Sequence, residues 1–101
     1  MNQPATPRID APSIGECNQG VMDALTRAKR IAIILARHGY SVLDISVGNR
    51  NARITLKASP RCAELDGAEI RYIRCHGGEQ ITMAANIEGV QVQWTMHWEA
   101  A

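Results

Sequence analysis

The hydrophobic positions of the chain follow two different periods, one before and one after Gly39. Between Glu16 and His38, apolar residues recur at spacings of three and four, which is typical of an amphipathic helix. Gly39 ends this pattern, because glycine readily takes the left-handed conformation that closes a helix. The face expected to be buried consists of Val21, Leu25, Ala28, Ile31, Ala32 and Leu35.

After Gly39, apolar and polar residues alternate in five runs, as they do in half-buried strands. The longest interruption is 59–67, where Pro60 and the Asp66-Gly67 pair predict a loop with a helical turn near Ala63. Gly77 and Gly78 are expected in a hairpin turn that needs positive φ at both positions. The strand residues expected to face the helix are Ile45, Ile54, Leu56, Ile70, Ile81, Met83, Val92 and Trp94.

This order of elements predicts an α+β fold, with one N-terminal amphipathic helix packed on a five-stranded, mainly antiparallel meander sheet. The second sheet face is expected to be wet, and a broad polar face of this kind can also receive a partner protein. Residues 1–15 hold three prolines and no apolar period, so we expect a flexible arm there and a single α+β domain over 16–101. The expected wet face contains Arg53, Thr55, Lys57, Glu69, Arg71, Ile73, Thr82, Asn86, Gln91, Gln93, Thr95 and His97.

Composition is that of an ordinary globular domain of 101 residues with one small core. The longest apolar run, Ile31 to Ala36, is too short to span a bilayer, and the first residues lack the pattern of a signal peptide. Three cysteines cannot all pair, which favours a reducing compartment. We therefore expect a cytoplasmic protein with no membrane partner.

Charge is unevenly distributed although the net charge is only +1. Residues 27–61 hold eight basic side chains and one acidic side chain, whereas 62–101 hold two basic and six acidic ones. A basic stripe over 27–61 can attract an anionic partner such as nucleic acid, or the acidic third of the chain can neutralise it in the fold. Tyr40 is the only aromatic residue in the stripe, which disfavours recognition of single strands by stacking.

Few residues are candidates for binding a metal or for catalysis. Cys75 and His76 are adjacent, and Cys62 lies far away in sequence, whereas zinc ligands occur as pairs two to four residues apart. No nucleophile, base and orienting group occur together in a recognisable arrangement around either cysteine. We therefore expect no catalytic residue, no cofactor and no metal site, and a protein that is not an enzyme.

The last strand has the clearest alternation in the chain, with Trp94, Met96 and Trp98 on one face. The simplest interpretation places them in the core beneath the helix. If this strand lies at a sheet edge, Trp98 extends past the helix and becomes an interface anchor or a dimer contact. A homodimer through an exposed sheet edge is therefore a second expectation.

The pattern of a helix ending in ILARHGYSVLDISV, then RITLKA, and a final VQVQWTMHW strand resembles small accessory proteins encoded in bacteriophage and prophage genomes. The resemblance covers about residues 20–98, and the best-known members of this group are anti-CRISPR proteins and other inhibitors of host defence. It implies a protein that acts in the host cytoplasm by occupying a surface of a host or phage machine. It assigns no functional residue.

Two functional hypotheses follow. The first is a non-enzymatic protein-binding module, an inhibitor that blocks a surface of a host complex in defence or nucleic-acid handling. The alternative is a small nucleic-acid-binding or regulatory protein that uses the basic stripe. The residues expected to contact the partner are Arg27, Arg30, Arg37, Arg50, Arg53, Lys57, Arg71 and His97.

Overall fold

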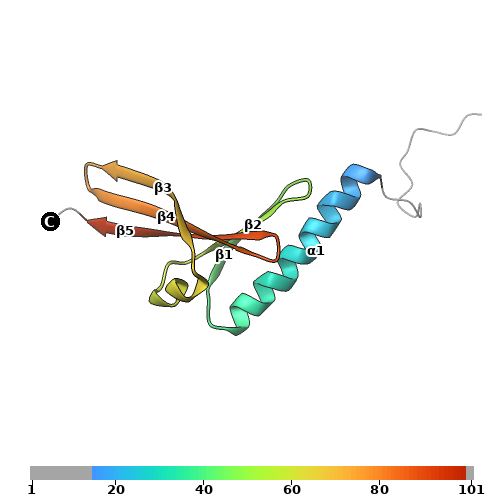
Figure 1. The fold of residues 1–101 in the computed structure, drawn as a ribbon, viewed down its shortest axis with the longest axis horizontal. Coiled ribbons are helices and arrows are strands. Elements are labelled where there is room, and N and C mark those ends of the chain that lie inside the picture. The colour runs from blue at the N-terminus through green and yellow to red at the C-terminus, as the bar shows by residue number, and fades with distance from the viewer. Residues whose placement is uncertain (1–14, 100–101) are drawn as a thin grey trace, which may run out of the picture.

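The structure, a computed structural model, describes residues 15–99 (Figure 1). The α+β class is confirmed, and the expected N-terminal arm lies outside these residues apart from Gly15. Helix α1 ends as expected, because Gly39 has φ +92° and follows the last turn. The elements are α1 (Glu16–Arg37), β1 (Val42–Val47), β2 (Ala52–Leu56), the 3₁₀ helix η1 (Pro60–Leu65), β3 (Ala68–Cys75), β4 (Gly78–Ile87) and β5 (Val90–Glu99).

The five strands form one sheet in the order β1-β2-β5-β4-β3. A β1–β2 hairpin and a β3–β4–β5 meander are each antiparallel, and the two units join where β2 runs parallel to β5. Ala52 lies opposite Val90 and Leu56 lies opposite Trp94 across this junction. The sheet is therefore mainly antiparallel, as expected, but its order is not that of one continuous meander.

The core lies between α1 and the β2–β5 junction. Most of the predicted helix face is confirmed, and Ala24 joins it, fully buried. Alanines in this face let the helix backbone approach the sheet closely, so that branched residues of β2 and β5 fill the space beneath it. The buried residues of these elements are Ala24, Ala28, Ile31, Ala32, Leu35, Ala52, Ile54, Leu56, Val90, Val92 and Trp94.

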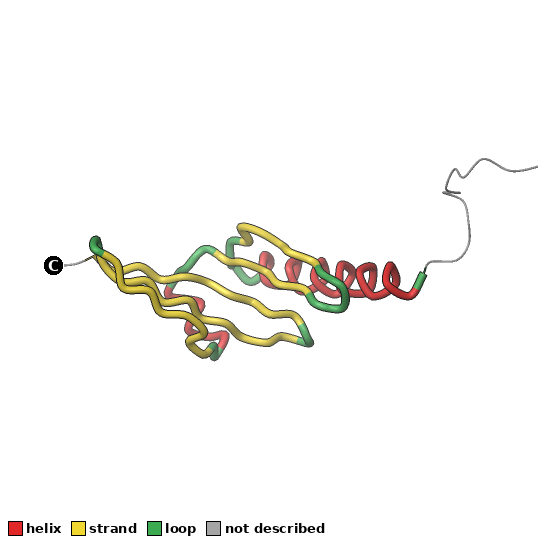
Figure 2. Tube along the Cα trace, turned by 90° about the horizontal axis from the view of Figure 1, so that it is seen from above, coloured by secondary structure: helices red, strands yellow, loops and turns green. Residues whose placement is uncertain are grey.

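Three residues predicted for the core are instead exposed. Leu25 is 46% exposed, Ile45 41% and Ile70 53%. Ile70 is exposed because the sheet is wide: α1 lies over β1 and β2, touches β5 least and leaves most of β3 uncovered (Figure 2). Ile45 and Ile70 belong to the two edge strands, β1 and β3, and Leu25 lies on the flank of the helix.

The prediction of the wet face is wrong for Glu69, because the register shifts within β3. Glu69 lies opposite Met83, and Met83 lies opposite Trp94, so all three belong to the face that α1 covers. The shift between Glu69 and Arg71 returns Arg71 to the other face, opposite Thr82. A bulge of this kind inserts one residue into the alternation, which a strict period of two cannot predict.

The expectation of positive φ at both glycines of the β3–β4 turn is wrong for Gly77. Gly78 alone has positive φ, at +147°, and it opens β4 rather than occupying the turn. A Cβ at Gly78 would run into the main-chain oxygen of Trp98, so this position needs glycine because the neighbouring strand passes very close to it.

Candidate protein-binding surface

The ends of β3, β4 and β5 project beyond α1 and η1 (Figure 1). On the side of the sheet that carries α1, Tyr72 lies opposite Ile81, and Ile81 lies opposite Met96. Trp98 follows Met96 by two positions in β5 and therefore points to the same side. We call these four residues, Tyr72, Ile81, Met96 and Trp98, the distal face.

The distal face exposes two large aromatic side chains. Tyr72 is 47% exposed and Trp98 is 48% exposed, while Ile81 and Met96 between them are partly buried. Arg74 and Glu79 border the patch, with 4.0 Å between the Arg74 Nε and a Glu79 carboxylate oxygen. The Glu79 carboxylate interacts with the Tyr72 hydroxyl and raises the pKa of Tyr72 above its ordinary value. The patch thus has an apolar centre and a charged border, as protein interfaces do.

A pocket of about 310 Å³ continues the distal face toward the core. It lies between η1 and the sheet, and Met96 belongs both to the pocket and to the distal face. Flexible methionine side chains adapt their shape to an inserted group. The pocket is lined by Ser59, Pro60, Cys62, Ala63, Asp66, Gly67, Met83, Trp94 and Met96.

The two described cysteine side chains lie on different elements. Cys62 belongs to η1 and is buried, with its Sγ 3.7 Å from the Ser59 hydroxyl and 3.8 Å from the Lys57 carbonyl oxygen. Cys75 is exposed at the end of β3, with its Sγ 3.5 Å from the Gly78 carbonyl oxygen. The structure therefore does not bring them together.

The eight residues predicted to contact a partner do not share one surface. Arg53 lies opposite Gln91. Gln91 lies between Val90 and Val92, whose side chains are buried on the α1 side, so Gln91 and Arg53 point away from α1. Arg71 and His97 point to the same open face, from strands β3 and β5. The remaining five lie on the helix or around the β1–β2 hairpin, namely Arg27, Arg30, Arg37, Arg50 and Lys57. The basic stripe of the sequence is thus divided between two sides of the sheet.

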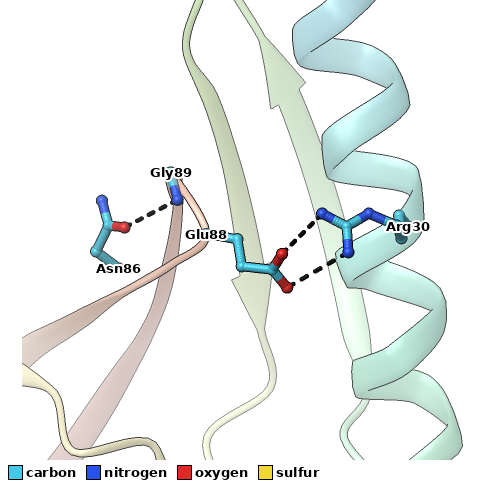
Figure 3. A network of polar contacts seen from close by, with 4 residues as sticks. All are labelled: Arg30, Asn86, Glu88 and Gly89. Atoms are coloured by element: carbon cyan, nitrogen blue, oxygen red, sulfur yellow. Dashed lines mark hydrogen bonds and ion pairs between the residues drawn. The ribbon is translucent and has the colours of Figure 1, made fainter.

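Arg30 anchors the helix to the β4–β5 turn (Figure 3). Its two terminal nitrogens donate to the Glu88 carboxylate oxygens at 2.9 and 3.4 Å. The turn is held by the Gly89 N–H, which donates to the Asn86 Oδ1 at 3.0 Å. Arg27 packs close to Gly89 on the same side of the helix. These two arginines therefore face the β4–β5 turn.

Replacing Arg30 with alanine is expected to lower the free energy of unfolding by no more than about 1 kcal/mol, because the pair with Glu88 is half exposed on both sides. Urea unfolding measures this change. The charge-swapped double variant Arg30→Glu/Glu88→Arg is expected to recover part of the loss. A loss of several kcal/mol would contradict this view of the pair.

The open face of the sheet carries a ladder of uncharged polar side chains. A ring nitrogen of His97 lies 3.1 Å from the Gln80 amide nitrogen, and the Thr82 and Thr95 hydroxyls are 2.9 Å apart. The Gln91 amide donates to the Gln93 oxygen at 3.0 Å. These side chains satisfy one another, so the open face offers fewer free polar groups than its composition indicated.

Trp98 is exposed at a point where β5 has a neighbouring strand on one side only. We expected its exposure if β5 lay at a sheet edge, and β5 is an inner strand only over Val90–Trp94, beyond which it pairs with β4 alone. Trp98 is exposed because β5 continues beyond the end of the helix and η1. The alternation of β3 placed Tyr72 in a strand, but it gave no signal that this strand lies outside the cover of α1.

Fold and surface together define a small α+β protein with an exposed aromatic patch. The model of the Kil protein family matches residues 14–95. The chain therefore belongs to the Kil protein family, a family of phage accessory proteins, as the resemblance implied in general terms. No curated protein and no solved structure shows significant similarity to the chain. Within residues 15–99, no helix has the length and apolar character needed to cross a membrane.

Proposed function

We propose that this protein acts without catalysis, by binding a protein of the bacterial host and blocking part of its surface with the distal face. The observation that carries the proposal is the pair of half-exposed aromatic residues, Tyr72 and Trp98, beside an apolar pocket. Tryptophan and tyrosine are enriched among the residues that dominate binding energy, because they bury a large area at little cost in entropy. The pocket gives a partner side chain a place to insert next to them.

Membership of the Kil protein family supports a host target, since Kil is a host-killing factor. A protein that kills by binding another protein must block a process that is essential to the host. Inhibition of a defence complex such as CRISPR protects a phage but leaves an uninfected host growing. We therefore favour an essential host protein as the target, and an anti-CRISPR role is the competing outcome.

The geometry gives less support to nucleic acid as the partner. Arg53 and Arg71 lie on the opposite side of the sheet from α1, and Arg30 already pairs with Glu88. A phosphate backbone needs several cations along one path. Direct binding to nucleic acid therefore remains the alternative hypothesis, and it predicts affinity for bare DNA or RNA that falls with salt.

Induced expression in the bacterial host tests the proposal. We expect wild-type protein to stop colony growth, and the Tyr72→Ser/Trp98→Ser double variant to lose this effect at equal expression and with an unchanged melting temperature. The matched control is Ile34→Ser, because Ile34 is also exposed but lies on the helix. Affinity capture is expected to recover a host protein with the wild type and the control but not with the double variant.

Three outcomes would contradict the proposal. One is a double variant that stops growth as efficiently as the wild type. Another is growth that continues under wild-type expression while a CRISPR assay shows inhibition, which would favour the defence target. The third is salt-sensitive binding of the purified protein to bare nucleic acid, with no host protein captured.

A further inference from the structure

Strand β5 has a free edge beyond Trp94. It pairs with β4 along its whole length, but its pairs with β2 end where Leu56 lies opposite Trp94. The chain leaves the line of β2 shortly after this point and enters η1, which begins at Pro60. Within residues 15–99, no other strand takes the vacant place beside the end of β5. We call this side of residues 95–99 the free edge of β5.

The main chain of the free edge directs hydrogen-bonding groups outward. Both central residues of the β4–β5 turn have positive φ, as in a two-residue hairpin turn whose flanking residues, Ile87 and Val90, bond to each other. Hydrogen-bonded and non-hydrogen-bonded pairs alternate along an antiparallel ladder, and the β4–β5 register has no shift. Met96 and Trp98 therefore bond to β4, whereas the N–H and C=O of His97 point away from it. Within residues 15–99, no loop hydrogen bond reaches these two groups of His97.

The free edge lacks the features that usually protect an exposed strand. Natural edges carry lysines, prolines, bulges or inward-pointing charges. The two edge strands, β1 and β3, each have a register shift, and β3 also carries Glu69, Arg71 and Arg74. Residues 95–99 keep a regular register with β4, and their one charged residue, Glu99, lies at the end. The free edge of β5 is therefore regular enough to accept another strand.

The side chains along the free edge alternate between two surroundings. Met96 and Trp98 point to the α1 side and belong to the distal face, whereas His97 points to the open face. The pocket of about 310 Å³ adjoins Met96, and its wall includes Ser59 and Pro60, where the chain has left the line of β2. The pocket therefore lies on the α1 side of the place that an added strand would take.

We infer that the host protein binds as an extended segment that adds a strand to the free edge of β5, an inference that rests on the proposed function. The main chain of this segment bonds to the N–H and C=O of His97, as in other cases of strand addition. Two of its residues, separated by one, point to the α1 side, level with Met96 and Trp98. The first side chain reaches the pocket and the second packs on the indole, so both are apolar. The residue between them faces the open polar face, so the segment alternates apolar, polar and apolar residues.

A second copy of the chain fits the free edge less well than a segment of another protein. Strand β2 occupies the same side of each β5 up to Trp94, so two free edges could pair only over residues 95–99. The register shifts of β1 and β3 interrupt the other edges that a second copy could offer. An extended segment of a host protein has neither limit. A dimer through this edge is therefore the competing outcome.

Replacing His97 with proline tests strand addition, because proline has no N–H to donate. The His97 N–H points away from β4, so His97→Pro is expected to melt close to the wild type. We expect it to recover about tenfold less host protein in affinity capture and to allow colony growth. The matched control is Ile45→Pro on the outer edge of β1. The Ile45 N–H also points outward, by the same alternation from the Gly48–Asn51 bond, and this variant is expected to capture the host protein like the wild type.

Comparison with other variants separates this inference from the proposed function. Full capture by His97→Pro, together with loss of capture by Tyr72→Ser/Trp98→Ser, would overturn strand addition and leave the distal face as the binding surface. Full capture by both variants would overturn both proposals. His97→Ala keeps the N–H and is expected to lose far less than His97→Pro. Equal losses for these two would mean that the side chain binds rather than the main chain, which would overturn strand addition.

A synthetic peptide gives a test that needs no substitution in the protein. The probe is a lysine-flanked peptide in which leucine and threonine alternate, and the control peptide has the same composition with its leucines grouped together. We expect only the alternating peptide to slow hydrogen exchange of the His97 N–H and to shift the Trp98 indole signal in NMR spectra of the full chain. Equal effects of the two peptides, or no slowing at His97, would overturn the inference. A doubled solution mass without peptide, with the His97 N–H already protected, would overturn it in favour of a second copy.

Discussion

Ile54→Ala is expected to lower the free energy of unfolding by about 2–5 kcal/mol, the range for buried aliphatic side chains cut back to alanine. Ile54 is fully buried in β2, beneath α1 and beside β5. Its loss would leave a cavity at the junction where the two halves of the sheet meet. Urea unfolding followed by circular dichroism measures the change.

Ile70→Ala is the matched control for this substitution. Ile70 has the same side chain, also lies in a strand, and was expected in the same core from its place in the alternation. It is 53% exposed in β3, so we expect a change within about 0.5 kcal/mol. Similar large losses for the two variants would mean that the outer strands are covered, in contradiction to the fold described above.

Trp98→Ala is expected to weaken binding to the host protein by at least about 2 kcal/mol, or roughly thirtyfold in Kd. The indole is half exposed in the free protein, at one end of the distal face, where it is one of two large exposed aromatic side chains. Burial against a partner would remove that exposed area from water. The loss is expected mainly as faster dissociation, since truncating a buried contact changes the dissociation rate most.

Calorimetric titration with the captured host protein measures this effect. Ile34→Ala is the control and is expected to bind like the wild type, because its exposed side chain lies on the helix away from the distal face. Trp98→Phe is expected to lose less than Trp98→Ala, since an aromatic ring remains to fill the site. If Trp98→Ala folds normally and binds with the wild-type affinity, the binding surface must lie elsewhere on the molecule.

Local periodicity predicted the elements of this fold well, but it could not predict their places across the sheet. The helix ending near Gly39 and the strong alternation of β5 depend on neighbours in sequence, and both are confirmed. Ile54 and Ile70 have equivalent positions in two alternating runs, yet one is buried and the other is exposed. Their difference arises from strand order, which places β3 at an edge of the sheet, and from the bulge between Glu69 and Arg71, in which Ile70 has no partner in β4.

The candidate surface was only partly predictable for the same reason. Arg30 has the features of a free cation in the sequence, but its partner Glu88 is far away in the chain and the two meet only in the fold. Trp98 was recognised as a possible anchor, whereas Tyr72 was assigned to a strand and not singled out. Recognising the pair requires the register that places Tyr72, Ile81 and Met96 in one row.

The parallel pairing of β2 with β5 has a consequence for how the chain folds. The β1–β2 hairpin and the β3–β5 meander can each form from close neighbours, but the buried core closes only when Val90, Val92 and Trp94 dock on Ile54 and Leu56. Contacts between distant segments carry the entropy of closing a long loop, and they slow folding. During synthesis, the apolar face of α1 therefore stays uncovered until β5, the last strand of the sheet, has left the ribosome. The core can close only after β5 has left the ribosome, and until then its apolar residues are open to chaperones and proteases.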